Sequence, residues 1–244
     1  MNRFLVPALD SSSNSVTITD LKLIHHLRDV LRLKAGEAVS VFDGKGNDCA
    51  AAIVKISADS VELVVKNRKV SVFRKVSVTI ACAIPKKSRF DDIVDKLTQL
   101  GVDRIIPLKT KRTIVKLTKE KEGARHKRWI KIALSASQQS QRSVLPHVEA
   151  LTDIKDVIKR SAEFDLKLIP TLEGERKGFK EVFSHPHPYR NILIFIGPEG
   201  DFTADEINLA RKNGFIPVSL GTSVLRVETA AVAVASFINL NENN

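Results

Sequence analysis

The sequence predicts an α/β fold in which a small β-rich domain precedes a larger domain built on a parallel sheet. Residues 1–70 contain short stretches that alternate apolar and polar side chains, the pattern of strands with one buried face. After residue 76, unbroken apolar runs alternate with helical periodicity, the pattern of βαβ units whose sheet is buried on both faces. Residues 67–75 are charged and poor in strand signals, so we expect a linker there between domains of residues 1–70 and 76–244.

The elements of both domains follow from these patterns. In the N-terminal domain we expect strands at residues 4–6, 16–18, 38–42, 49–56 and 61–65. One helix interrupts them; it is capped by Thr19 and carries Leu23, Leu27, Val30 and Leu31 on one face and Arg28 and Arg32 on another. In the C-terminal domain we expect strands at 76–84, 104–108, 166–169, 192–196 and 216–220. The expected helices cover 91–100, a segment that begins within 109–131 and ends near 139, a segment from the capping box of Thr203 and Glu206 to Asn213, and 229–240.

Three of these strands end in loops suited to bind a ligand. The run at 192–196 stops at residues 197–200 (GPEG), the strand at 216–220 closes with residues 221–223 (GTS), and the strand at 166–169 ends in residues 170–174 (PTLEG). Parallel strands bring their carboxyl ends to one edge of a sheet, where α/β proteins have their clefts. The sequence therefore predicts a pocket there, in which a Cβ added at Gly197, Gly200 or Gly221 should clash with ligand or backbone.

The net charge of +11 is unevenly distributed. Residues 86–142 carry 16 Lys and Arg against 6 Asp and Glu, whereas residues 143–244 carry 11 against 14. A basic excess beside a nearly neutral ligand-binding region favours a nucleic-acid partner, although a solvated basic face is the alternative.

The two loop motifs together are more specific than either alone. Residues 197–202 (GPEGDF) followed by residues 220–230 (LGTSVLRVETA) resemble the signature of the uracil-N3-methyltransferases of small-subunit (16S) ribosomal RNA, the RsmE family of SPOUT trefoil-knot methyltransferases. Residues 26–32 (HLRDVLR) are similar to the N-terminal, PUA-like RNA-binding β-barrel of this family, and residues 138–146 (QQSQRSVLP) to another of its elements. The weaker likeness of residues 96–102 agrees with these.

The resemblance implies a fold, a reaction and partners. The C-terminal parallel sheet would form a deep trefoil knot, with S-adenosyl-L-methionine held bent among the knot loops. The enzyme would methylate N3 of a specific uridine in 16S rRNA, as free RNA or in the assembled small ribosomal subunit, and would act as a homodimer. Three positions depart from the family pattern, which usually has a glycine at Asp201, a basic residue at Ser223 and an acid at Gln138. A neutral Gln138 argues against a catalytic base at that position.

Methylation of N3 requires in-line approach, loss of the N3 proton and stabilisation of charge on the uracil oxygens. Arg226 and Arg142 suit the charge, and Glu199 or Glu228 could take the proton. The alternative is structural: the carboxylates orient backbone donors, and Arg226 pairs with Glu228 or a carbonyl to hold the loop.

The expected site residues therefore form three groups. The catalytic candidates are Arg226, Glu199 and Arg142. We expect cofactor contacts from Thr171, Leu172, Gly197, Pro198, Glu199, Gly200, Leu220, Gly221 and Leu225. We expect RNA contacts from Arg3, Arg28, Arg32, Lys86, Lys111, Arg112, Arg125, Lys127 and Arg142.

Two other functions remain open: a related knotted methyltransferase acting on tRNA or 23S rRNA, and a non-catalytic RNA-binding protein. A dinucleotide-dependent oxidoreductase is disfavoured because the G-x-G at residues 44–46 lies in the β-rich region, with no helix after it. We expect no metal, because residues 185–187 (HPH) are isolated from other ligand types, and we expect Cys49 and Cys82 to be free core thiols. Lacking a signal-like or membrane-length apolar run, the protein is expected in the cytoplasm, with no membrane partner.

Overall fold

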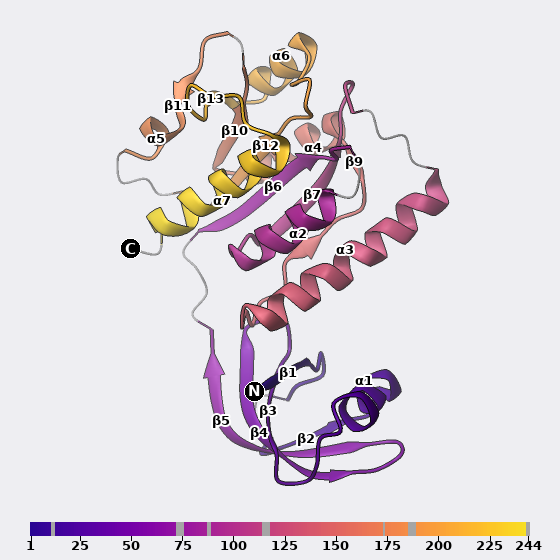
Figure 1. Cartoon of the computed structure of the whole chain (residues 1–244). Helices are drawn as coiled ribbons and strands as arrows, with labels where there is room; N and C mark the ends of the chain where they lie inside the picture. Colours follow the sequence, from indigo (N-terminus) through magenta and orange to yellow (C-terminus); the bar gives the residue numbers. More distant parts are fainter. Residues whose placement is uncertain are drawn as a thin grey trace. The chain divides into compact units, whose positions relative to one another are not determined.

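A computed structural model describes residues 1–10, 13–71, 76–86, 89–113, 118–172, 174–184 and 189–242 (Figure 1). The chain divides into two compact units: unit 1 comprises Met1–Phe73 and Ser137–Leu145, and unit 2 comprises Arg74–Ala136 and Pro146–Asn244. Residues 72–75 of the predicted linker and the HPH segment at 185–187 lie outside the described residues. The inclusion of Ser137–Leu145 in unit 1 was not expected from the sequence pattern.

Unit 1 is built on a five-stranded sheet with the order β1-β3-β4-β5-β2. Its strands are β1 (Asn2–Leu5), β2 (Ser15–Ile18), β3 (Ala38–Phe42), β4 (Asn47–Ile56) and β5 (Val61–Val70). The β1–β3 pair is parallel and the other pairs are antiparallel. In the described residues, β1 and β2 stand at the two ends of the strand order. The β-rich domain is confirmed, but the prediction that a linker starts at residue 67 is wrong. Residues 67–70 pair with residues 47–50, because ladder hydrogen bonds use the backbone whatever the charge of the side chains.

The helical segment of unit 1 differs from the prediction in its N-terminal capping residue and in its number of residues per turn. Helix α1 (Leu21–His25) is capped by Asp20 rather than Thr19, since the Asp20 carboxylate accepts the backbone N–H groups of the first turn. It continues as the π-helix η1 (His26–Val30), in which the N–H of Leu31 donates to the carbonyl of His26. The wider turn rotates later side chains away from the expected face, so Leu27 is fully buried while Val30 is 58% exposed.

Unit 2 contains the predicted parallel sheet, with the order β11-β13-β10-β12-β6-β7-β8 and β9 paired with β7. Every pairing in it is parallel. The strands are β6 (Ser77–Ala83), β7 (Arg104–Lys109), β8 (His147–Val148), β9 (Thr152–Asp153), β10 (Leu166–Pro170), β11 (Lys177–Gly178), β12 (Asn191–Ile196) and β13 (Ile216–Ser219). The five longer strands match the predicted ones to within one or two residues, whereas the two-residue strands carry too little pattern to be predicted.

The helices of unit 2 lie on both faces of its sheet (Figure 1). They are α2 (Arg89–Gln99), α3 (Lys119–Gln139), whose last residues count with unit 1, α4 (Ile154–Lys159), η2 (Ser161–Glu163), α5 (Phe179–Val182), α6 (Ala204–Lys212) and α7 (Val227–Glu242). The four longer helices were predicted, and the capping box of α6 is confirmed by reciprocal bonds between Thr203 and Glu206. The shorter α4, α5 and η2 span one or two turns, too few for a helical period to stand out.

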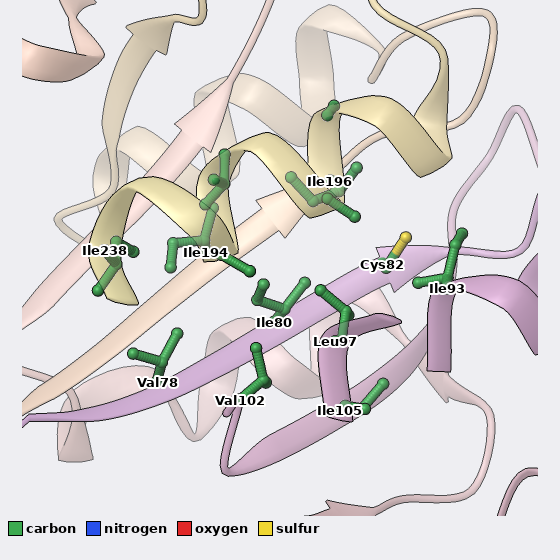
Figure 2. Close-up of a cluster of buried hydrophobic side chains, with 14 of the residues drawn as sticks. Val78, Ile80, Cys82, Ile93, Leu97, Val102, Ile105, Ile194, Ile196 and Ile238 are labelled. Carbon is green, nitrogen blue, oxygen red and sulfur yellow. The ribbon is translucent and has the colours of Figure 1, made fainter. Parts of the chain in front are cut away.

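The unbroken apolar runs reflect a sheet covered on both sides. Figure 2 shows the side chains between the sheet and helices α2 and α7, among them Ile80 of β6 and Ile194 of β12. Their chain neighbours Ala81 and Phe195 belong to a second buried cluster, which includes residues of α4 and α6. Because successive side chains of a strand point to opposite faces, both faces of these strands must be apolar. Because both faces of the sheet are covered by apolar layers, a polar site is expected at the carboxyl ends of the strands.

Candidate functional site

The loops that follow β10, β12 and β13 line a single pocket in unit 2. These strands are neighbours in the sheet and run parallel, so their carboxyl ends lie at one edge. The predicted cofactor residues found in the pocket lining are Thr171, Leu172, Gly197, Pro198, Glu199, Leu220, Gly221 and Leu225. The structure thus brings together eight residues that the sequence spreads over more than fifty positions.

Gly200 is the predicted cofactor residue that does not line the pocket. Its carbonyl accepts a hydrogen bond from Nη1 of Arg112, and a Cβ added to it would lie 3.5 Å from Cδ of Arg112, an ordinary contact. Arg112 also donates to the carbonyl of Phe202 at 3.4 Å. Arg112 therefore holds the outer side of the loop after β12, a contact between residues 88 apart that no local pattern could predict.

The three glycines differ in what a side chain would meet within the chain. At Gly197 an added Cβ would lie 3.1 Å from the Phe202 ring, so the ring would have to shift. At Gly221 nothing lies within 4 Å, but φ is +128°, a conformation that side-chain-bearing residues rarely adopt. Within the chain, an added Cβ would thus crowd a side-chain ring at Gly197, take a rare conformation at Gly221 and make an ordinary contact at Gly200. The expected clash with a ligand stays a prediction.

Asp201, which stands where the resembling family usually has glycine, joins two of the pocket loops. Its φ is +59°, in the left-handed region that Asp tolerates better than most residues. The carboxylate accepts the N–H of Phe202 at 2.7 Å and the N–H of Leu172 at 2.8 Å. The loop after β12 is therefore tied to the loop after β10, and the departure from glycine has a structural use.

Arg176 is a pocket residue that sequence reasoning missed. It lines the pocket, and its Nη1 donates to the carbonyls of Thr171 at 2.8 Å and Leu172 at 2.6 Å. The loop after β10 thus has its carbonyls fixed by a guanidinium and one N–H fixed by Asp201. The only sequence signal is the position of an Arg a few residues after a strand end, within reach of that loop's carbonyls.

The three catalytic candidates occupy different environments. Glu199 is exposed at the pocket, and its carboxylate accepts the N–H of Lys86 at 3.1 Å. Arg226 is exposed between two lining residues, and its side chain makes no hydrogen bond or ion pair with the described part of the chain. Arg142 belongs to unit 1. The alternative in which Arg226 pairs with Glu228 is wrong, because Glu228 pairs instead with Arg89 at 3.2 Å.

The predicted RNA contacts of unit 1 are not equally available. Arg3 is engaged internally: its side chain is 9% exposed and forms an ion pair with Asp48. Arg28 is paired with Asp29, whose pKa is lowered to about 2 by hydrogen bonds from Arg28 and then His25. Arg32 is exposed, with a φ of +53°. A charge held by an internal partner offers less to a phosphate, so Arg32 has the most accessible charge of the three.

The predicted RNA contacts of unit 2 lie on α3 and on the loops after β6 and β7. Lys86, Lys111 and Lys127 are exposed, and Arg125 is partly buried. The Nζ of Lys111 lies 4.0 Å from the Asp205 carboxylate, an exposed pair that screening keeps weak. These side chains are some of the accessible members of the basic excess read from the sequence.

Cys82 lies at the end of β6, but its environment does not suit a nucleophile. The side chain is fully buried and not in a disulfide, like that of Cys49. Burial, followed by the charges of Glu228 and Glu199, raises the pKa of its thiol well above the ordinary value. Cys82 therefore stays protonated and packs as an apolar side chain.

Two further properties concern the described residues alone. Nowhere in them do three or more His, Cys, Asp or Glu side chains gather in a way that could hold a metal ion. None of the helices they form is both long and apolar enough to cross a bilayer.

Comparison with known families first defines the class. Residues 73–239 match the RNA methyltransferase domain family, and residues 18–66 match the RNA methyltransferase PUA domain family. The PUA match falls on the smaller sheet of unit 1, and the methyltransferase match falls on the sheet of unit 2 that carries the pocket. The class is therefore an RNA methyltransferase domain preceded by a PUA domain.

Individual relatives narrow the class. The ribosomal RNA small subunit methyltransferase E of Synechocystis is 34% identical, over 92% of this chain and 73% of the relative. That of Mesomycoplasma hyopneumoniae is 32% identical, over 95% of this chain and 96% of the relative. The crystal structure of the Neisseria gonorrhoeae enzyme of the same name, bound to S-adenosyl methionine, superposes with a TM-score of 0.85 at 29% identity, over 98% of this chain and 97% of that one. The chain belongs to the ribosomal RNA small subunit methyltransferase E family.

Proposed function

We propose that this protein transfers a methyl group from S-adenosylmethionine to N3 of a uridine in the 16S ribosomal RNA of the small subunit. The observation that carries the proposal is the pocket formed by the loops after β10, β12 and β13, in a chain of this family. Its Neisseria relative, similar over nearly the whole chain, binds S-adenosyl methionine. The uracil-N3 position is what the resemblance of the loop motifs to the RsmE family implies.

The pocket fits such a cofactor through its backbone and its apolar side chains. At Gly197 an added Cβ would crowd the Phe202 ring at 3.1 Å, and in the glycine bare backbone forms that wall. Leu172, Leu225 and Val224 supply apolar surface for an adenine ring, and backbone N–H and C=O groups supply hydrogen bonds. The pocket volume is about 90 Å³, below the ~300 Å³ at the small end of ligand pockets. A cofactor must therefore extend into the open mouth or spread the loops.

The residues around the pocket have distinct chemical tasks in this proposal. S-adenosylmethionine, when bound, supplies a methyl group on a positively charged sulfur. Glu199 can accept the N3 proton of the uridine at its exposed carboxylate, with the Lys86 N–H orienting that carboxylate. Arg226, whose donors are free of partners among the described residues, can donate to a uracil oxygen as negative charge develops there. Arg142 would bind the substrate base or a phosphate.

The proposal includes the partners that the sequence implies. RNA contacts the basic side chains of both units, and affinity falls steeply with salt as phosphate counterions are released. A homodimer would cover apolar side chains that are exposed in the single chain, such as Leu240 of α7 at 67% exposure. The knotted threading of the sheet and a cytoplasmic location belong to the same proposal. Sedimentation that gives a monomer at micromolar concentration would contradict the dimer.

Methylation mapping tests the proposed reaction. The purified protein would be incubated with S-adenosylmethionine and either free 16S rRNA or small subunits from a strain lacking its own enzyme. We expect 3-methyluridine by mass spectrometry of nucleosides and a stop in primer extension at one uridine, because an N3 methyl blocks the base-pairing edge. A methyl group on another atom, on tRNA or on 23S rRNA would assign the pocket to a different substrate, and no methylation of any RNA would reject the proposal.

A further inference from the structure

Unit 1 contains a cavity of about 350 Å³ that the proposed methyl transfer does not use. Its floor is one face of the sheet, where Arg3, Ser40, Ala50 and Asn67 form a row of directly paired residues across β1, β3, β4 and β5. The two central positions carry small side chains and the two outer positions carry large polar ones. The row therefore makes a hollow with polar ends.

The wall of this cavity comes from the end of α3 and the turn after it. Gln138, Gln139 and Gln141 line it, and Nε2 of Gln138 donates to the Arg3 carbonyl at 2.9 Å. Gln141 has a φ of +58°, which is unfavourable for a residue with a side chain. The carboxamides of Gln139, Gln141 and Asn67 make no hydrogen bond within the described part of the chain.

Other polar groups of unit 1 are buried and unpaired. Arg3 uses Nη1 for Asp48 and Nη2 for Ser143, but its Nε is buried without a partner among the described residues. The hydroxyl oxygens of Ser137 and Ser140 are in the same condition, and they are the only other such side-chain atoms in the described residues. All three atoms belong to unit 1. These three atoms are buried, and Ser137 and Ser140 do not line the cavity. The groups open to a ligand are therefore the unbonded carboxamides of Gln139, Gln141 and Asn67, which do line it.

The chemistry of the cavity defines the class of ligand. The charges of Arg3 and Asp48 neutralise each other, so an ion is not the preferred occupant. Carboxamides present a donor and an acceptor side by side, which matches the edges of a nucleobase, and unpaired RNA bases are commonly read in this way. Lys69, exposed at the rim, can meet a phosphate. We propose that this cavity binds one unpaired nucleobase of the RNA, an inference that rests on RNA being the substrate.

The test compares RNA with and without bases. Fluorescence anisotropy would measure binding of a single-stranded uridine decamer, an adenosine decamer and an abasic ribose-phosphate strand of equal length. Ala50→Leu fills the floor of the cavity, and we expect it to weaken binding of a base-bearing strand about tenfold while binding of the abasic strand and its salt dependence stay unchanged. The matched control is Val54→Leu on the same strand, 53% exposed and outside the cavity, which should change neither.

A second variant guards against misfolding. Gln141→Gly removes a carboxamide at a positive φ that glycine adopts freely, so the melting temperature should stay equal or rise. We expect it to weaken binding of a base-bearing strand about threefold.

Two outcomes would overturn the proposal. In one, Ala50→Leu and Gln141→Gly bind every strand as the wild type does. In the other, they weaken self-association in sedimentation and leave RNA binding intact, which would make the cavity an interface between copies. If the variants weaken binding of base-bearing strands but the protein methylates no RNA, the cavity proposal stands and only the proposed reaction is rejected.

Discussion

The pocket of unit 2 and the cavity of unit 1 differ in how their polar groups are satisfied. In the pocket, loop carbonyls and N–H groups are bonded to side chains of the chain itself: Asp201 accepts the N–H of Leu172, and Arg176 donates to the carbonyl of Thr171. Outside the pocket lining, Arg112 holds the carbonyl of Gly200 in the same way. In the cavity, the carboxamides of Gln139, Gln141 and Asn67 have no partner among the described residues. One site has its shape fixed by its own loops, while the other keeps its hydrogen-bonding capacity for a ligand.

This difference predicts which substitutions each site tolerates. A pocket shaped by backbone should be sensitive to added bulk and to loss of the bonds that hold its loops. A cavity that recognises its ligand through side chains should be sensitive to truncation of those side chains, with little cost in stability. Among the substitutions at four positions of unit 2, those at Gly197 and Asp201 test the first half of this comparison.

The largest effect is expected at Arg226. Unlike the bonded groups of the pocket loops, its side chain has no partner in the described part of the chain. Arg226→Lys keeps the charge but loses the planar fork of donors. We expect a single-turnover methylation rate lower by about tenfold to a thousandfold, with the melting temperature and cofactor affinity unchanged. An unchanged rate at saturating substrates would remove Arg226 from the reaction. A joint loss of stability and affinity would make its role structural.

Gly197→Val tests the backbone wall most directly. The new Cβ would lie 3.1 Å from the Phe202 ring, and overpacking of this kind costs about 1–3 kcal/mol. We expect cofactor affinity to fall by at least about tenfold in calorimetry, with unfolding still cooperative. The control is Gly123→Ala on α3, where no atom lies within 4 Å and helix propensity should raise stability by roughly 0.5–1 kcal/mol. Normal affinity in Gly197→Val would mean that this wall does not touch the cofactor.

Asp201 separates backbone conformation from loop bonding. Asp201→Gly relieves the positive φ but removes both accepted hydrogen bonds, whereas Asp201→Asn keeps an acceptor and loses the charge. We expect cofactor affinity to fall about threefold to tenfold in Asp201→Gly and less in Asp201→Asn, because a charge-assisted bond contributes roughly 1.5–3 kcal/mol and part of this is recovered. If Asp201→Gly binds as tightly as the wild type, the link to Leu172 does not shape the pocket.

The smallest effect concerns Asp165, which satisfies backbone groups at the start of β12. Hydrogen bonds from the N–H groups of Arg190 and Asn191 lower the pKa of its carboxyl. A lowered folded pKa gives stability that is present above the unfolded pKa, near 3.9, and is lost as pH falls through the folded value. Asp165→Asn should lower the melting temperature slightly at pH 7, with the difference shrinking below about pH 4. A difference that does not depend on pH would show that the carboxylate charge is irrelevant.

Much of the fold could be predicted from the sequence because it depends on patterns among residues close together in the chain. Apolar runs placed the strands of unit 2, and the pairing of Thr203 with Glu206 placed the start of α6. Eight cofactor-pocket residues came together because parallel strands share one edge. The same local reading failed in α1 and η1, where Asp20 competes with Thr19 as a cap and a π turn breaks the 3.6-residue period.

The rest of the site depends on contacts between distant residues. Arg112 meets Gly200 across 88 positions, and Asp201 meets Leu172 across 29. Such bonds are fixed by how the loops pack, so the sequence could supply candidate residues but not their partners. The membership of Ser137–Leu145 in unit 1, and with it the cavity, was unpredictable for the same reason.

The strand order of unit 2 has a consequence for synthesis on the ribosome. β6 (Ser77–Ala83) lies between β7 and β12, and β7 follows it directly, but β12 begins only at Asn191. Until that residue has been made, one edge of an apolar strand has no neighbour, a condition that invites pairing with other chains. Every insertion between β7 and β12 lengthens this interval. The nascent chain thus carries an aggregation hazard in a strand that later has a neighbour on each edge.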